Sequence, residues 1–144
     1  MKKVYLPNTV VIIGDGAFVN CLSLESVNIP DTVEYIGSYA FGTNGLATSQ
    51  NMKVSVTSLP SHLKEIGGWA FTHGGDNIKF SIIPEQITKI PSYCFSHCPN
   101  LQVEEIGTEE SGKSVTYIDI GAFNNSGLNV TKLTLGSGIE TINL

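Results

Sequence analysis

Charged residues and long apolar runs are scarce in this 144-residue sequence. Only 15% of its residues are charged, against about 25% in a typical soluble domain. The formal net charge is −5, which argues against a nucleic-acid-binding protein because such proteins carry basic patches. No apolar run approaches the roughly 20 residues that a membrane-spanning helix needs. We therefore expect no nucleic-acid partner and no membrane span.

Targeting and catalytic motifs are missing as well. The N-terminal stretch MKKVYLPNTV has no long apolar core, so it does not read as a secretory signal. This leaves two alternatives open, a cytosolic protein or a piece of a longer secreted chain. The sequence contains no nucleophile elbow, no GxGxxG motif and no P-loop. We predict a protein that is not an enzyme, has no catalytic residues and uses no cofactor.

One hexapeptide pattern, by contrast, recurs along the whole chain. It reads IGDGAF at 13–18, IGSYAF at 36–41, IGGWAF at 66–71, IPSYCF at 90–95 and IDIGAF at 118–123, so the phenylalanines are 23, 30, 24 and 28 residues apart. A sixth copy begins near Ile142, and we number the copies repeats 1 to 6. Such short units predict a solenoid, because each is too small to close its own core and is covered by its neighbours.

The shared positions predict how one repeat is built. LESVNI at 24–29 has the spacing of a strand, a proline then ends it, and TVEYI at 32–36 forms a second extended segment. Strands of successive repeats should pair in parallel, about 4.8 Å apart. Gly14, Gly37 and Gly67 suit a tight turn or a positive φ. The predicted core comprises the isoleucine and phenylalanine of each hexapeptide, namely Ile13, Phe18, Ile36, Phe41, Ile66, Phe71, Ile90, Phe95, Ile118 and Phe123.

The repeat pattern, clearest in IPDTVEYIGSYAF at 29–41 and IGDGAFVNCLSLESVNIP at 13–30, resembles the BspA-like (Treponema pallidum type) leucine-rich repeat family. The resemblance covers residues 1–142. It implies a leucine-rich repeat solenoid of mostly strand and loop. In this fold a right-handed coil carries a parallel β ladder, a second short extended segment per repeat and short helical or 3-10 turns. We expect one domain over residues 1–144, with about five repeats and a partial sixth, cut from a longer array.

The resemblance also implies a function. Members of the family are surface or secreted proteins used in adhesion and protein–protein interaction, and their ligands include host matrix proteins and proteins of other cell surfaces. We therefore expect a protein-binding module at the cell surface or outside the cell. Two alternatives stay open, a structural spacer and a carbohydrate-binding domain. Both ends of the chain should expose apolar core, which predicts end-to-end self-association.

Residues at the same repeat position form columns, and two columns are candidate sites. Tyr39, Trp69 and Tyr93 stand two residues before the phenylalanine and should lie about 5 Å apart, within stacking range. This column is either a ligand-binding strip or a packing ladder, and we favour packing. His73 and His97 should be neighbours in the column two residues after the phenylalanine. With Asp76 they resemble part of a zinc site, but no further ligand has suitable spacing, and we predict no metal.

The strand face and the insertions are the remaining candidates. Candidate contacts on the strand face are Asn28, Lys79 and Lys132, and ion pairs are expected between Glu34 and Lys64 and between Glu65 and Lys89. Extra residues at 42–51 and 107–114 are interpreted as loops, the second of them solvated. The three cysteines, Cys21, Cys94 and Cys98, occupy small-residue positions and are expected to be free thiols.

Overall fold

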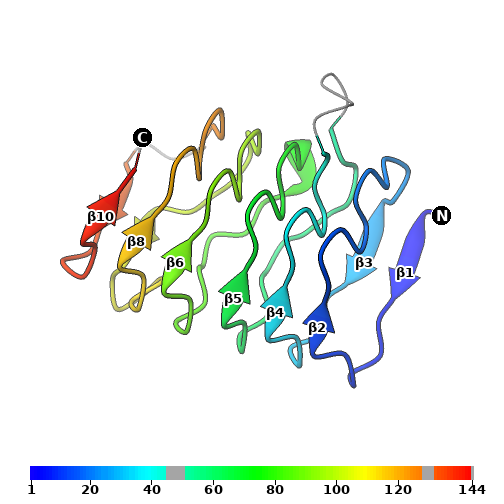
Figure 1. Ribbon diagram of the computed structural model, residues 1–144, viewed down its shortest axis with the longest axis horizontal. Coiled ribbons are helices and arrows are strands. Elements are labelled where there is room, and N and C mark those ends of the chain that lie inside the picture. Colours follow the sequence, from blue (N-terminus) through cyan, green and yellow to red (C-terminus); the bar gives the residue numbers. More distant parts are fainter. Residues whose placement is uncertain (45–50, 128–131, 144) are drawn as a thin grey trace.

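The structure is a computed structural model that describes residues 1–44, 51–127 and 132–143. It consists mostly of short strands and loops, and within these ranges it has one short 3-10 helix, η1 (Gly75–Asn77). Figure 1 shows the repeats side by side in a row from the N-terminal to the C-terminal end. Every strand pair that joins two repeats is parallel.

The strands that end on the isoleucine of each hexapeptide form what we call the second-strand ladder. Its members are β2 (Ile12–Ile13), β4 (Tyr35–Ile36), β5 (Glu65–Ile66), β6 (Lys89–Ile90), β8 (Tyr117–Ile118) and β10 (Thr141–Ile142). The register places Ile13 opposite Ile36 and Ile36 opposite Ile66, and does the same for Ile90, Ile118 and Ile142. It is the register that aligns the hexapeptides.

This ladder is divided into two sheets between β5 and β6, at the point where proline replaces glycine. Elsewhere the residue after the isoleucine donates its N–H to the isoleucine of the preceding repeat, as Gly67 does to the carbonyl of Ile36 at 2.7 Å. Pro91 has no N–H, so the equivalent bond to Ile66 is not possible. We call this break the Pro91 seam.

The opposite side of the repeats, which we call the main-strand face, is less regular. It contains β1 (Lys3–Tyr5) paired with β3 (Ser26–Asn28), and β7 (Glu105–Ile106) paired with β9 (Thr134–Leu135). Single bridges join Ser26 to Ser55 and Val56 to Ile78. Val56 stands four residues before its proline and Ile78 stands six before its own, so the register slips by two residues between repeats 3 and 4.

The core lies between the two sides. The isoleucines Ile13, Ile36, Ile66, Ile90 and Ile118 are all buried, as are Phe41, Phe71 and Phe95. Phe18 and Phe123, in the first and last complete repeats, are only partly buried. Successive phenylalanine rings lie 5.3 to 5.8 Å apart between centroids. Burial of one such ring stabilises the fold by about 1.5–3 kcal/mol, so this column is the main apolar contribution that every repeat shares.

A third set of contacts joins the repeats along what we call the turn edge, formed by residues 14–20, 37–43, 67–73, 91–97 and 119–125. Here each repeat donates backbone N–H groups to the carbonyls of the next. Phe41 donates to Ala70 at 2.8 Å, and across the Pro91 seam Phe71 donates to Cys94 at 2.9 Å. Unlike the second-strand ladder, the turn edge is therefore continuous from repeat 1 to repeat 5.

At Gly37 and Gly67 the glycine that follows the isoleucine allows close packing and does not adopt a positive φ, which corrects one of the two sequence-based interpretations. A Cβ atom on Gly37 or Gly67 would overlap the backbone of the preceding repeat at Asp15 or Ser38. Neither glycine has a positive φ. The space around Gly14, in repeat 1, is open, so the close approach at Gly37 and Gly67 comes from the repeat that is stacked against each of them.

Candidate functional site

The aromatic column of the turn edge is stacked. The ring centroids of Tyr39 and Trp69 are 5.4 Å apart with an interplanar angle of 8°, and those of Trp69 and Tyr93 are 5.5 Å apart at 15°. Tyr39 and Tyr93 are partly buried, and Trp69 is 36% exposed. The structure thus brings the three predicted residues together, each on its own repeat.

The backbone at these three residues is in the left-handed region. Their φ values are +56°, +56° and +51° for Tyr39, Trp69 and Tyr93, and the glycines in the same column, Gly16 and Gly121, have φ of +62° and +61°. For a residue with a side chain this conformation costs roughly 1–2 kcal/mol, whereas glycine adopts it freely. Stacking of one aromatic pair contributes about 0.5–1.5 kcal/mol, so it offsets much of this strain.

Stacking also decides which part of each ring a ligand can reach. Both faces of Trp69 lie against a neighbouring ring, and a Cβ atom on Gly121 would contact the ring of Tyr93. Trp69 and Tyr93 therefore offer ring edges to their surroundings. Sugar recognition on aromatic residues uses ring faces, so the geometry favours the packing interpretation over the carbohydrate alternative.

A groove of about 200 Å³ runs along this stack. The aromatic residues line one part of it and His73 and His97 another. Thr43, Thr72 and Ser96 also line it and are 2%, 4% and 2% exposed. The Thr43 Oγ1 is buried without a hydrogen-bond partner, the one such side-chain atom among the described residues. Burial of such an unpaired atom lowers the stability of the fold by about 1–3 kcal/mol. The repeat pattern does not predict this feature.

The two histidines are stacked neighbours, as their shared column predicts. Their ring centroids are 4.2 Å apart at 13°. His97 is held by Ser96 Oγ at 2.8 Å from Nδ1 and by Asn125 Nδ2 at 3.2 Å from Nε2. Burial, and then the neighbouring His97, lower the pKa of His73, so the neutral form is favoured. No group of three potential metal ligands occurs among the described residues.

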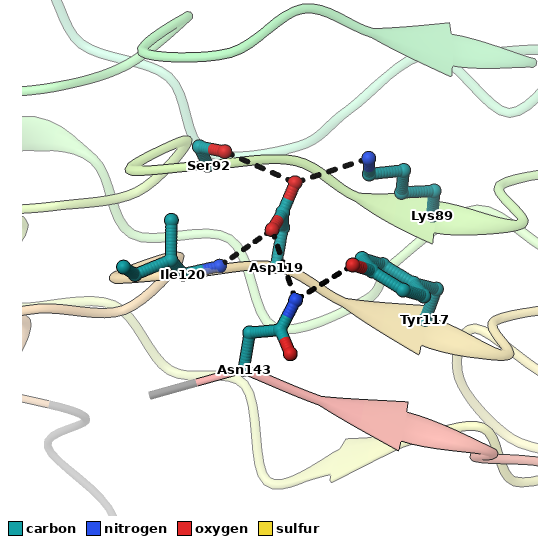
Figure 2. A network of polar contacts seen from close by, with 6 residues as sticks. All are labelled: Lys89, Ser92, Tyr117, Asp119, Ile120 and Asn143. Atoms are coloured by element: carbon teal, nitrogen blue, oxygen red, sulfur yellow. Dashed lines mark hydrogen bonds and ion pairs between the residues drawn. The ribbon is translucent and has the colours of Figure 1, made fainter.

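A polar network on the second-strand ladder links repeats 4, 5 and 6 (Figure 2). Asp119 accepts the N–H of Ile120 at 2.8 Å and the hydroxyl of Ser92 at 3.0 Å, and its Oδ2 is 3.0 Å from the Nζ of Lys89. Asn143 of repeat 6 donates to Asp119 at 3.3 Å. The N–H of Ile120, followed by Lys89, holds the pKa of Asp119 well below its ordinary value.

This network does not have the properties of a catalytic centre. Asp119 is ionised and fully engaged, so it is a poor general acid or base at neutral pH. It acts as a clip that orders the repeats on the C-terminal side of the Pro91 seam. Its partners come from three repeats and from different columns, and the repeat alignment therefore did not reveal it.

One of the two predicted ion pairs is confirmed and the other is wrong. Lys64 Nζ lies 2.7 Å from Glu34 Oε2, as expected. The expected pair of Glu65 with Lys89 is wrong, because Lys89 turns toward Asp119 and also lies 4.7 Å above the ring of Tyr117. The reason is the Pro91 seam, which leaves β5 and β6 unpaired while β6 pairs with β8.

The candidate residues of the main-strand face have different environments. Asn28 is occupied, because its side chain accepts the N–H of Leu6 at 2.7 Å and donates to the carbonyl of Leu6 at 2.9 Å. Lys79 and Lys132 are exposed. The three lie on separate repeats and do not converge on a common cavity. Asn28 therefore completes the pairing of β1 and β3, and only the two lysines stay open as surface contacts.

A hollow that the sequence did not predict lies on this face between repeats 4 and 5. Its volume is about 400 Å³, and Ile82, Glu104, Glu105 and Glu110 are among the residues that line it. A second, mostly apolar hollow of about 430 Å³ lies beside Ile82 and is also lined by Leu59. Ile82 is 61% exposed, so an apolar side chain stands between two cavities.

The insertion of repeat 5 forms one wall of the first hollow. The N–H of Thr108 donates to the carbonyl of Ser111 at 3.1 Å, and the hydroxyl of Thr108 donates to Glu105 at 2.7 Å. Ser111 is buried, and its Oγ accepts the N–H of Ile83 at 2.9 Å. The 107–114 insertion is therefore a loop whose charged residues Glu109, Glu110 and Lys113 are exposed, as expected, and whose buried Ser111 anchors it on repeat 4. The loop expected at 42–51 falls mainly on residues 45–50, outside the described residues.

The three cysteines form no disulfide bond. Cys21, Cys94 and Cys98 are free, and burial raises the pKa of Cys98 to about 12, so this thiol is inert at neutral pH.

In repeats 5 and 6 a hollow of about 490 Å³ is lined by apolar residues that include Ile142, which is 47% exposed. End-to-end association through this surface stays a prediction.

A family model described as "BspA type Leucine rich repeat region (6 copies)" matches residues 1–59 and 48–144. The chain therefore belongs to the BspA-type leucine-rich repeat family. This family is generally non-enzymatic, is associated with protein–protein interaction and commonly occurs in surface or secreted proteins. No curated protein and no solved structure matches the chain. None of the helical segments that the structure describes has the length and apolar character needed to cross a membrane.

Proposed function

We propose that the chain is a non-enzymatic adhesion module of a surface or secreted protein, folded as a right-handed solenoid. It binds a protein partner on the main-strand face, and host matrix proteins and proteins of other cell surfaces are the partners to test first. The exposed Ile82 between two hollows carries the proposal. Interfaces bury an apolar centre within a polar rim, and this part of the face has an exposed apolar side chain beside polar residues.

The charge of the surroundings narrows the partner. Glu104 and Glu110 are exposed and line the first hollow together with Glu105, and none of the described residues that line it is basic. A partner segment that places an apolar side chain on Ile82 and a lysine or arginine beside it would match both features. Complementary charge of this kind increases association rates and specificity more than affinity.

The weak pairing of the main-strand segments supports the same location. Between repeats 4 and 5 the main-strand segments are joined by Gln102, whose N–H donates to the carbonyl of Phe80 at 3.2 Å, and by the bonds of the insertion. They form no named strand pair. A partner can therefore fill space between these two repeats, whereas β1 pairs with β3 and β7 pairs with β9 at the two ends of the same face.

A peptide display selection tests this proposal. Immobilised wild-type protein is used to select peptides, and the selected peptides are then measured against Ile82→Ser and Glu110→Gln. The matched control is Ile12→Ser, because Ile12 is 65% exposed but belongs to the second-strand ladder. We expect basic, apolar-containing peptides whose affinity falls about tenfold or more in Ile82→Ser and is unchanged in Ile12→Ser. Equal losses in both isoleucine variants would contradict the proposal.

A further inference from the structure

We propose that the Pro91 seam is an acid-sensitive joint, at which repeats 3 and 4 separate more readily when the pair of His73 and His97 takes up protons. The pair lies across the seam, because His73 belongs to repeat 3 and His97 to repeat 4. Mild acid would therefore loosen the solenoid at one defined place. The joint does not depend on the function proposed for the hollows around Ile82.

The first support is the small number of bonds that hold repeats 3 and 4 together. At the other joints the second-strand ladder contributes bonds such as that of Gly67 to Ile36, whereas β5 and β6 are unpaired across the seam. The backbone bonds that remain run along the turn edge as far as Gly75 and beside the single bridge between Val56 and Ile78. A disturbance of the turn edge at this joint is therefore not compensated by the second-strand ladder.

The second support is the position of the two histidines within these remaining bonds. Their ring centroids lie 4.2 Å apart. The N–H of His73 donates to the carbonyl of Ser96 at 2.9 Å, and the carbonyl of His97 accepts the N–H of Gly75 at 3.2 Å. Both histidines have a left-handed backbone, with φ of +54° and +57°, which is uncommon for residues with a side chain. Repulsion between the rings would therefore act directly on bonds that cross the seam.

The third support is the lack of a compensating charge near the pair. The other titratable side chains that line the groove beside it are Tyr39 and Tyr93, and none of the described lining residues is a carboxylate. Asp76 is exposed and does not line the groove. Opposite charges favour the protonated form of a histidine and like charges disfavour it. Two protonated rings at this distance would therefore repel each other without a neighbouring anion to offset the repulsion.

The hydrogen bonds of the pair also suit its neutral form. The Asn125 amide donates to Nε2 of His97 at 3.2 Å, so this nitrogen accepts and carries no proton in this arrangement. Nδ1 of the same ring lies 2.8 Å from Ser96 Oγ. Among the described residues no hydrogen bond reaches the ring of His73. A proton added to Nε2 of His97 would face a donor, and one added to His73 would find no acceptor among these side chains.

The direction of the effect follows from the folded and unfolded states of His73. Burial, and then the neighbouring His97, lower its pKa in the folded protein, whereas an unfolded histidine has a pKa of about 6.5. The unfolded state therefore binds more protons, and the stability of the joint falls as the pH decreases below about 6.5. The Asp119 clip weakens only below about pH 3.9, so the two effects occupy different pH ranges.

The test measures hydrogen-exchange protection factors at about pH 7.5 and about pH 5, on either side of the histidine range. The amides of Phe71 and His73 donate across the seam, and those of Phe41 and Thr43 make the same bonds between repeats 2 and 3. We expect equal protection of both pairs at the higher pH. At the lower pH the seam pair should lose about threefold or more in protection relative to the other pair. An equal change in both pairs overturns the proposal, because the acid effect would then not be local.

Two variants assign the effect to the pair. His73→Asn keeps a residue that this column already uses, because Asn20 and Asn125 have φ of +55° and +51° at the same position. It should make the seam protection independent of pH and reduce the fall of the unfolding midpoint between the two pH values by about 2–4 °C. His97→Asn should remove only part of the acid effect, because His73 stays partly buried.

The matched control is His62→Gln, since His62 is the third histidine of the chain and is exposed. This variant should lose seam protection in acid as the wild type does. A His73→Asn or His97→Asn protein that keeps the full wild-type loss contradicts the proposal, and so does a His62→Gln protein in which the loss disappears.

Discussion

The turn edge and the main-strand face join the same repeats in different ways. Along the turn edge each repeat donates the same backbone N–H groups to the next, and the bonds continue across the Pro91 seam. On the main-strand face the pairing consists of β1 with β3, two single bridges, and β7 with β9. The regular side carries the recurring hexapeptide, and the irregular side carries the insertion of repeat 5.

This difference separates what repetition specifies from what it leaves free. The turn edge needs a phenylalanine and a small residue at fixed positions, because each fits against its counterpart in the next repeat. The main-strand face tolerates a register slip of two residues and an ordered insertion. The hollows around Ile82 lie beside the register slip and the insertion. Variation between copies therefore produces the surface that is available for binding.

The largest expected effect is on the core column. Phe71→Ala should lower the free energy of unfolding by about 3–5 kcal/mol, because Phe71 is fully buried between two other rings. Phe123→Ala should cost clearly less, since Phe123 is only partly buried. Chemical denaturation of both variants measures the difference. Equal losses of unfolding free energy in the two variants would mean that the phenylalanine column does not hold the repeats together.

A smaller effect tests the stacking of the turn edge. Gly67→Ala should destabilise the fold by about 1–3 kcal/mol, because the added methyl group would overlap the backbone of repeat 2. Gly14→Ala occupies the same position in repeat 1, where the space is open, and should change stability by less than about 0.5 kcal/mol. Thermal unfolding compares the two, and similar midpoints would contradict the role assigned to close approach.

The clip at Asp119 should stabilise the C-terminal repeats in a pH-dependent way. Because its pKa is lowered in the folded state, its contribution is present above the ordinary aspartate pKa of about 3.9 and disappears as the pH falls below that value. Asp119→Asn should lower the midpoint at neutral pH by about 2–4 °C, or about 1 kcal/mol after allowance for solvent screening.

The control for this prediction is the exposed Glu85, as Glu85→Gln. The difference between Asp119→Asn and the wild type should shrink as the pH is lowered from about 5 toward 2, whereas the Glu85 variant should follow the wild type throughout. A gap between Asp119→Asn and the wild type that is independent of pH would show that Asp119 acts only through packing.

The smallest effect concerns backbone strain at Trp69. Trp69→Ala and Trp69→Gly both remove the ring, but only glycine adopts the positive φ of this residue without strain. Trp69→Gly should therefore be more stable than Trp69→Ala by about 0.5–1 kcal/mol. The reverse order in equilibrium unfolding would show that the left-handed backbone is not maintained once the ring is absent.

The sequence was sufficient for the features that recur and insufficient for those that occur once. Alignment of the hexapeptides predicts the second-strand register, the stacked aromatic residues and the neighbouring histidines. The positive φ of the aromatic residues could also have been predicted, because Gly16 and Gly121 stand in the same column. The Asp119 clip and the anchored insertion depend on single side chains that meet across repeats, and periodicity carries no information about such pairs.

Native-state hydrogen exchange tests most directly whether the turn edge is the continuous element of the fold. The amides of Trp69 and Phe71 donate across the Pro91 seam, and those of Tyr39 and Phe41 make the same bonds where the second-strand ladder is intact. We predict equal protection of the amides in both pairs and faster exchange at the amide of Ile82. Much faster exchange at Trp69 and Phe71 than at Tyr39 and Phe41 would contradict it, because the repeats would then separate at the seam.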